Sequence, residues 1–139
     1  MSINITEELK KRMKADEPAA LYEYSELVRE TDPIESEKYA VLAAQLGFVP
    51  AFERVGDKCL GDGDVENAAL YFKAGAKAGI LDCSVKLAAL RLDDDESEAV
   101  RELEELAEAG VRSACTALSE YYIGIGNRKQ AAYWLSLIE

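Results

Sequence analysis

The segment that decides the fold is GDGDVENAALYFKAGAKAG, residues 61–79. Its first half, GDGDVE, looks like the acidic start of a calcium-binding loop. Its second half has the small and apolar residues of a helix that packs against a neighbour. Whether the segment binds a metal or only joins two packed helices depends on whether it recurs elsewhere in the chain.

The segment belongs to an internal repeat. Gly47, Gly79 and Gly110 each end an apolar helical pattern (AAQLG, AKAG and AEAG), at spacings of 32 and 31 residues, and one further step back lands on Asp16. Such self-similarity is the sequence signature of a repeat architecture. The predicted repeats are residues 17–47, 48–79, 80–110 and 111–139 of a single domain, 1–139, preceded by a capping helix over 5–15.

Aligned positions, called columns below, share residue character across the four repeats. The fourth residue after each boundary is small, and the residue types recur in both halves of each repeat at i, i+3, i+4 and i+8, the spacing of an amphipathic helix. The small residues of the first column are Ala20, Ala51, Cys83 and Ala114. Each repeat is therefore a helix hairpin, and stacking hairpins buries the apolar side that one hairpin cannot bury alone. The predicted fold class is all-α, a right-handed α/α solenoid of four hairpins with nine helices in total.

The first helix is expected to begin after Thr6, whose hydroxyl can act as the N-cap. Ile5, Leu9 and Met13 recur at four-residue steps and would let this helix cover the first hairpin.

The segment GDGDVE occupies the same slot as IGIGNR in the last repeat. The shared glycines, Gly61/Gly124 and Gly63/Gly126, predict a tight turn with positive φ. Asp64 can cap the helix that follows. The slot therefore predicts a turn between two helices.

Neither a metal site nor a cofactor site is predicted. A calcium loop needs a glutamate at its twelfth position, and counting from Asp62 that position is Lys73. The cysteines, Cys59, Cys83 and Cys115, are odd in number and form no C-x-x-C pair, so they are expected to be reduced thiols that fill small core positions.

Catalysis is also not expected. The chain has no histidine, the most frequent general base. Four carboxylates recur on one helix, but they read as a solvated face: Glu102, Glu104, Glu105 and Glu108. The prediction is a protein that is not an enzyme.

The formal net charge of −11 repels nucleic-acid backbones, so direct binding of nucleic acid is not expected. No apolar run is as long as a membrane span, and the N-terminal segment MSINITEELKKRMK lacks the apolar centre of a signal peptide. We expect a cytoplasmic protein that does not enter membranes.

At these columns the chain resembles the Sel1-like repeat family, a relative of the tetratricopeptide repeats, over about residues 17–139. The family pattern reads roughly A-x-x-x-L-G-x-x-Y-x-x-G-x-G, then K-A-x-x-W-Y-x-K-A-A-x-x-G. The fourth repeat carries it at Ala114, Leu118, Tyr122, Gly124, Gly126, Ala131 and Trp134, and the second at Ala51, Val55, Gly56, Ala68, Tyr71, Phe72, Gly75 and Gly79. The chain departs from the family pattern at three positions. In the second repeat Cys59 replaces a tyrosine, and in the third repeat Arg91 replaces a tyrosine and Glu102 replaces an aromatic residue.

The resemblance implies a non-enzymatic scaffold or adaptor that binds a partner protein or peptide on a concave face, lined by the first helix of each repeat. Carried over by column, the residues of that face are Tyr22, Glu26, Arg29, Glu53, Asp57, Leu60, Val85, Ala89, Leu92, Thr116, Glu120 and Ile123. These residues mix carboxylates with modest apolar area, which suits a partner peptide with basic and apolar residues.

Two other functions fit the sequence. An acidic chain can inhibit a basic protein site by mimicking a nucleic acid. A repeat protein can also assemble with itself, here as a homodimer through the C-terminal segment AAYWLSLIE. In that segment Trp134, Leu135 and Ile138 are expected to face inward, and Tyr133 and Leu137 to leave some apolar area exposed. The opposing expectation is that the last helix packs fully.

Overall fold

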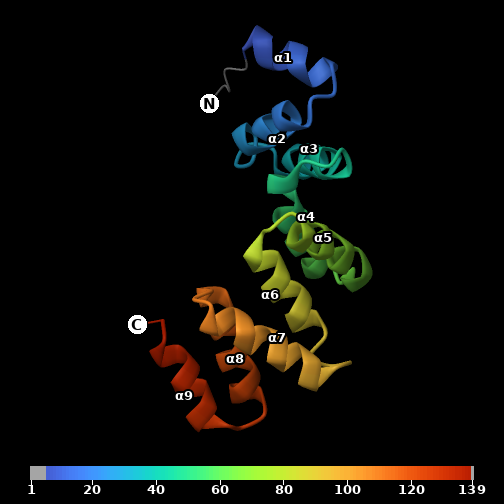
Figure 1. The fold of residues 1–139 in the computed structure, drawn as a ribbon. Coiled ribbons are helices and arrows are strands. Elements are labelled where there is room, and N and C mark those ends of the chain that lie inside the picture. The colour runs from blue at the N-terminus through green and yellow to red at the C-terminus, as the bar shows by residue number, and fades with distance from the viewer. Residues whose placement is uncertain (1–5, 139) are drawn as a thin grey trace. The chain divides into compact units, whose positions relative to one another are not determined.

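In the computed structural model, residues 6–138 are described, and all regular elements among them are α-helices (Figure 1). The nine helices of this part of the chain are α1 (Glu7–Lys14), α2 (Pro18–Leu27), α3 (Pro33–Gln45), α4 (Val49–Gly61), α5 (Val65–Lys77), α6 (Leu81–Leu90), α7 (Glu96–Glu108), α8 (Arg112–Gly124) and α9 (Arg128–Ser136). The predicted all-α fold class is confirmed.

The four positions chosen by the periodicity share one backbone conformation. Asp16, Gly47, Gly79 and Gly110 have φ values of 56°, 88°, 92° and 96°. At each of them the next residue donates its N–H to the carbonyl five residues earlier, as Phe48 does to Ala43 at 3.0 Å. This is the left-handed helix end that glycine adopts without steric cost. Each of these residues therefore ends one helix and sets the direction of the next.

The turn formed by GDGDVE is structural. Asp64 accepts a hydrogen bond from the backbone N–H of Asn67 at 3.2 Å and so caps α5 as predicted. Gly63 and Gly126 both have a φ of 82°. Gly61 and Gly124, in contrast, are the last residues of α4 and α8, so the prediction of positive φ at these two glycines is wrong. The helices extend through them because glycine tolerates helical dihedrals as well.

The chain divides into two compact units, residues 1–71 and 72–139, here called the N-terminal and C-terminal units. In the N-terminal unit, consecutive helices from α1 to α4 pack against one another. Its apolar core is built largely from alanine and other small side chains, with Leu21 and Val55 among its larger members. These small side chains let the helix axes approach closely.

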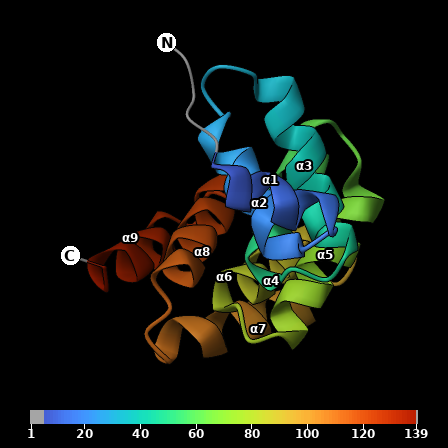
Figure 2. The same ribbon diagram turned by 90° about the horizontal axis from the view of Figure 1, so that it is seen from above.

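The C-terminal unit has a more strongly apolar core. Its helices α6 to α9 pack in sequence, and α6 also contacts α8. Figures 1 and 2 show α8 and α9 side by side. Val85, Leu103, Leu118 and Trp134 form the centre of this unit and are all buried.

The first column of small residues is fully buried in both units, with Ala20, Ala51, Cys83 and Ala114 all 0% exposed. A larger side chain at any of these positions would separate two helices. The expected core role of the thiols is confirmed for Cys83 and Cys115, which are buried, while Cys59 is half-buried.

The two terminal helices, α1 and α9, follow the prediction at the Thr6 cap and at Trp134. Thr6 caps α1 by accepting a hydrogen bond from the N–H of Leu9 at 3.1 Å, as predicted, while Ile5 lies outside the described residues. In α9, Trp134 is buried, whereas Leu135, which was predicted to lie on the inward side and to be partly covered, keeps 40% of its surface exposed. Leu135 follows directly after Trp134, and adjacent helical residues point about 100° apart, so the neighbouring helix covers only the first of them.

Candidate functional site

The N-terminal unit has a groove of about 630 Å³ formed by α2, α3 and α4. We call it the serine–arginine groove, and its lining residues are Tyr22, Glu26, Arg29, Pro33, Ser36, Glu37, Pro50, Glu53, Arg54, Asp57 and Lys58. Pro33 and Pro50 stand in the first turns of α3 and α4, where a missing N–H costs nothing.

Two buried serines in columns of small residues meet beside the groove, and Ser36 is among its lining residues. The hydroxyl of Ser25 donates to the carbonyl of Tyr22 at 2.6 Å, and the hydroxyl of Ser36 donates to the carbonyl of Ser25 at 2.6 Å. Because both hydroxyl protons are used in this way, each oxygen is left as an acceptor. Alanine in the same columns would offer no such acceptor.

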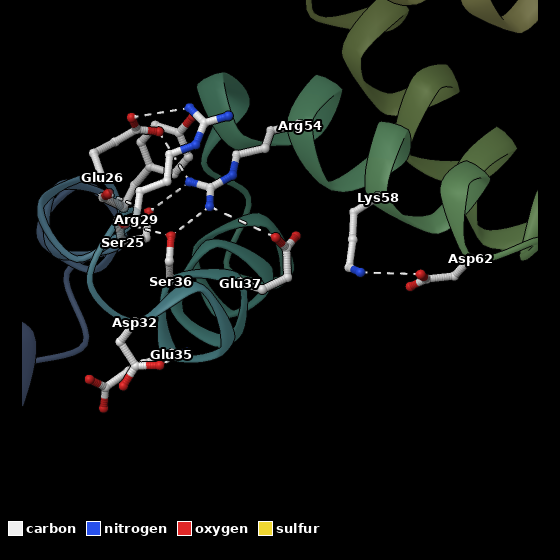
Figure 3. Close-up of polar contacts among 11 residues, drawn as sticks. Ser25, Glu26, Arg29, Asp32, Glu35, Ser36, Glu37, Arg54, Lys58 and Asp62 are labelled. Carbon is white, nitrogen blue, oxygen red and sulfur yellow. Dashed lines mark hydrogen bonds and ion pairs between the residues drawn. The ribbon is translucent and has the colours of Figure 1, made fainter.

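Arg54 of α4 meets these two acceptors. Its Nη1 donates to Ser25 Oγ at 3.2 Å and its Nη2 to Ser36 Oγ at 2.7 Å (Figure 3). Nη1 also donates to Glu26 Oε1 at 3.1 Å. The side chain of Arg54 is only 16% exposed, so the planar guanidinium is held in place by three oxygen atoms from two helices.

Glu37 contributes the least satisfied charge of the groove. One of its oxygens, Oε2, lies 3.9 Å from Nη2 of Arg54, an ion pair without a hydrogen bond. The other oxygen, Oε1, is buried and has no hydrogen-bond partner among the described residues. A buried carboxylate oxygen without a donor is costly, and a donor group that enters the groove would remove that cost.

Tyr22 provides the aromatic surface of the groove. Its ring packs on Phe48 at 5.4 Å between centroids, and the guanidinium of Arg54 lies 5.8 Å from the ring centre. Burial raises the pKa of the Tyr22 phenol, Glu26 raises it further, and Arg54 opposes the shift. The phenol therefore stays protonated at neutral pH and available as a hydrogen-bond donor.

The structure brings five of the twelve residues predicted for the concave face together in this groove: Tyr22, Glu26, Arg29, Glu53 and Asp57. Leu60, near the end of α4, is exposed but is not among the residues that line the groove. In the C-terminal unit, Thr116, Glu120 and Ile123 are exposed and Ala89 and Leu92 are half-buried.

Val85 differs from the rest of the set. It is 4% exposed and belongs to the core of the C-terminal unit, so its side chain is not part of a surface. The column transfer placed it by position alone, whereas α6 is contacted by both α7 and α8, which cover this side chain.

Sequence reasoning missed Ser36 and Glu37 on α3 and Arg54 on α4 as site residues. They were overlooked because the resemblance assigns binding to one residue set on the first helices. A signal was present, since Ser36 is a hydroxyl residue in a column where the other repeats carry alanine, and Ser25 shares its column with Gly56, Ala88 and Ser119. Two buried hydroxyls require partners, and a nearby arginine can satisfy both.

Within residues 6–138, no group of three or more potential metal ligands comes together.

The glutamates of α7 do not form the uniformly solvated face that was expected. Glu102 pairs with Arg91 and is half-buried, as is Glu104, while Glu105 pairs with Arg101 at 2.8 Å. Glu102 and Glu105 are thus each held in an ion pair with an arginine. None of the helices described has both the length and the apolar character to cross a membrane.

Comparison with solved structures identifies the fold. The chain is similar to the crystal structure of a Sel1 repeat protein from Oxalobacter formigenes, with a TM-score of 0.62 and 23% sequence identity. The match covers 94% of this chain and 60% of the length of that protein. The chain thus has the helical fold of a Sel1-like repeat. No family model and no curated protein matches the sequence.

Proposed function

We propose that the chain is a non-enzymatic protein-interaction module and that the serine–arginine groove binds a peptide segment with basic and apolar residues. The observation that carries this proposal is the buried, unpartnered Oε1 of Glu37 in a groove of about 630 Å³. A lysine or arginine side chain of the partner would supply the missing donor.

The surroundings favour a cation over an anion in this position. Arg54 is already engaged with Glu26 and the two serines, so its positive charge is largely used within the protein. The groove lining contains four carboxylates and three basic side chains, and the whole chain carries a formal charge of −11. This field attracts a basic partner and accelerates its association. The half-buried ring of Tyr22 lines the groove and can receive an apolar residue next to the cation.

The test is a binding titration with a short fluorescein-labelled peptide in which lysine and leucine alternate. Glu37→Gln keeps the size of the side chain but removes its charge, so the affinity should fall by about tenfold, equal to about 1.4 kcal/mol. Glu30→Gln removes the same charge from an exposed residue outside the groove lining and should leave the affinity within about twofold.

Equal binding by wild type and the folded Glu37→Gln variant would reject the groove as the site. Salt separates this proposal from mimicry of a nucleic acid. A peptide held by one ion pair and apolar contacts should lose affinity gently between low and moderate salt. A mimic that opposes many basic groups at once should lose it steeply.

The proposal also includes exposed first-helix residues of each unit taken by itself, namely Leu60 in the N-terminal unit and Thr116, Glu120 and Ile123 in the C-terminal unit. Reversing Glu120 to lysine should then weaken a long basic ligand but leave the short peptide unaffected. A cytoplasmic location is part of the same proposal, supported by the sequence pattern of the cysteines, which are odd in number and form no C-x-x-C pair.

Self-assembly is the second candidate function, and α9 is the observation that favours it. Tyr133 and Leu137 are each about half exposed, and Leu135 adds further apolar area. Analytical ultracentrifugation of the wild type and of Leu137→Glu tests this: a homodimer through α9 should dissociate in the variant. A wild type that is monomeric at high concentration would reject it.

A further inference from the structure

The N-terminal unit has a second cavity, of about 440 Å³, on the helices α1, α2 and α3. We call it the lysine-rimmed cavity. Its chemistry differs from that of the serine–arginine groove, and the two cavities share no lining residue.

The floor of this cavity is apolar and preformed. It consists of Met13 from α1, Leu21 from α2, and Tyr39 and Leu42 from α3. Leu21 is buried, whereas Leu42 keeps 36% of its surface exposed. The rings of Tyr39 and Tyr24 pack in a T-shaped arrangement, with 4.8 Å between the centroids and an interplanar angle of 81°. An apolar side chain that enters would therefore meet a surface that needs no rearrangement.

Lysines form the rim. Lys10 and Lys14 lie one turn apart on α1, and Lys38 lies on α3, while Asp16 is the one carboxylate among the lining residues. The formal charge of the lining is therefore +2, in a chain whose overall charge is −11. This is a local reversal of the sign of the surface.

Two of these lysines have no ion-pair partner in residues 6–138, namely Lys14 and Lys38. Lys38 lies 5.5 Å from the ring centre of Tyr39, and Lys10 pairs with Glu7 at 3.3 Å. That pair is strongly exposed and therefore weak, so Lys10 can exchange it for another carboxylate at little cost. The chain has 27 acidic residues, yet apart from Asp16 none of the described ones lines this rim.

From this juxtaposition of an open apolar floor and uncompensated ammonium groups, we propose that the lysine-rimmed cavity binds an acidic amphipathic helix of a partner protein. One apolar side chain of the helix packs against Tyr39 and Leu42. Carboxylates one turn apart on that helix pair with Lys10 and Lys14, because the turn spacing of about 5–6 Å is the same on both helices. A carboxylate on the other side of the apolar residue meets Lys38.

The distribution of charge decides between a helix and other anionic ligands. The ammonium groups come from two different helices, so a small monocarboxylate could neutralise only one of them. An anionic membrane surface would be repelled by the acidic remainder of the chain. A helix is narrow enough to reach the rim without bringing further negative surface close to the protein.

The test uses the full chain and a fluorescein-labelled helical peptide with leucines at i, i+3 and i+7 flanked by glutamates. Lys14→Glu combined with Lys38→Glu should weaken binding at least about tenfold, since two attractive pairs become repulsive. The matched control is Lys73→Glu combined with Lys77→Glu, two exposed lysines of α5 that change the net charge equally. The control should leave the affinity within about twofold.

A second pair of variants separates the floor from the rim. Leu42→Ser should weaken the acidic peptide several-fold, while Leu70→Ser, at an exposed position of α5, should not. Lys14→Gln combined with Lys38→Gln should also weaken binding of the acidic peptide, but by less than the glutamate variant, because it removes attraction without adding repulsion. Circular dichroism confirms that each variant is folded. The lysine–leucine peptide of the proposed function should bind all of these variants as it binds the wild type, so either proposal can fail alone.

Three outcomes overturn the inference. The first is equal affinity of the acidic peptide for wild type and for both double variants of Lys14 and Lys38, to glutamate and to glutamine. The second is tight binding of decanoate with no binding of the peptide, which assigns the cavity to a free anionic amphiphile. The third is self-association of the wild type that both lysine variants abolish, which makes a second copy of the chain the occupant.

Discussion

The two compact units place chemically different side chains at equivalent positions of their helix repeats. Three positions of the N-terminal unit have counterparts at the same offset in the C-terminal unit: Ser25 and Ala88, Ser36 and Ala99, Arg54 and Ala117. Hydroxyl, hydroxyl and guanidinium meet in the first unit through hydrogen bonds. In the second unit, Ala88 and Ala99 are buried methyl groups and Ala117 packs against the apolar core.

This difference shows that a column of small residues fixes helix separation and leaves polarity open. Serine and alanine are both small enough for close helix contact, but a buried serine oxygen can in addition accept a hydrogen bond from a donor that reaches it. Arg54 supplies that donor, and its charge then attracts Glu26 and Glu37. The polar groove of the N-terminal unit therefore depends on two hydroxyl groups that meet an arginine. The C-terminal unit also buries a serine, Ser119, but its hydroxyl donates to the carbonyl of Thr116 and Ala117 stands in the column of Arg54.

The largest effect is expected for the core of the C-terminal unit. Leu103 is fully buried, and the aligned residue of the N-terminal unit is Ala40. Leu103→Ala should lower the free energy of unfolding by about 2–5 kcal/mol, because it removes apolar burial and leaves a cavity. Urea denaturation measures this loss. Leu137→Ala, at a half-exposed position of α9, is the control and should cost less than about 1 kcal/mol. Equal losses would show that the C-terminal unit lacks a tightly packed centre.

A smaller effect is expected at Arg54. Arg54→Ala leaves Ser25 and Ser36 with unmet acceptors and leaves Glu26 and Glu37 without their cation, which should cost about 1–3 kcal/mol. Arg54→Lys should recover only part of this, because an ammonium group cannot reach both hydroxyls with the geometry of the guanidinium fork. Lys58→Ala removes a neighbouring cation whose pair with Asp62 is exposed, and should cost no more than about 0.5 kcal/mol.

Conversion of the N-terminal unit to the chemistry of the C-terminal unit sharpens the comparison. The triple variant Ser25→Ala, Ser36→Ala, Arg54→Ala removes donor and acceptors together, so it should be more stable than Arg54→Ala alone and lie within about 1 kcal/mol of wild type. Urea denaturation again provides the measurement. A triple variant less stable than the single variant would mean that the serines stabilise the fold by their bonds to backbone carbonyls, independently of Arg54.

Much of the fold could be predicted from the sequence because it depends on local signals. The boundary positions Asp16, Gly47, Gly79 and Gly110 were recognisable from periodicity, and all adopt the left-handed conformation. The cap at Asp64 depends only on its distance from the helix start. Such features involve residues a few positions apart, so the sequence contains both partners of each interaction.

The site could be predicted only in part because its decisive contacts join distant residues. Arg54 meets Ser25 and Ser36 across gaps of 29 and 18 residues. Column alignment identified Tyr22 and Glu26, which project from α2, but it carries no information on which side chain of a neighbouring repeat satisfies a buried hydroxyl. The lysine-rimmed cavity was missed for a related reason. Three of its lining side chains project from α1, which lies outside the repeats, so column alignment could not relate them to α2 and α3.

The smallest effect concerns a second pair of equivalent positions. In the N-terminal unit these are Cys59 and Tyr71, and burial raises the pKa of both side chains above their usual values. In the C-terminal unit the same columns hold Arg91 and Glu102, where Nη1 of the arginine donates to both carboxylate oxygens at 3.0 Å. An apolar pair in one unit is thus replaced by an ion pair in the other.

The two charged side chains are 37% and 34% exposed, so solvent screens their attraction. A double-mutant cycle with Arg91→Met and Glu102→Gln should therefore give a coupling of only about 0.5 kcal/mol, which shrinks further in high salt. The exposed pair of Arg101 and Glu105 provides a reference cycle with a smaller coupling still. A coupling above about 2 kcal/mol for Arg91 and Glu102 would contradict this ranking. It would mean that the ion pair holds α6 and α7 together as firmly as apolar packing does.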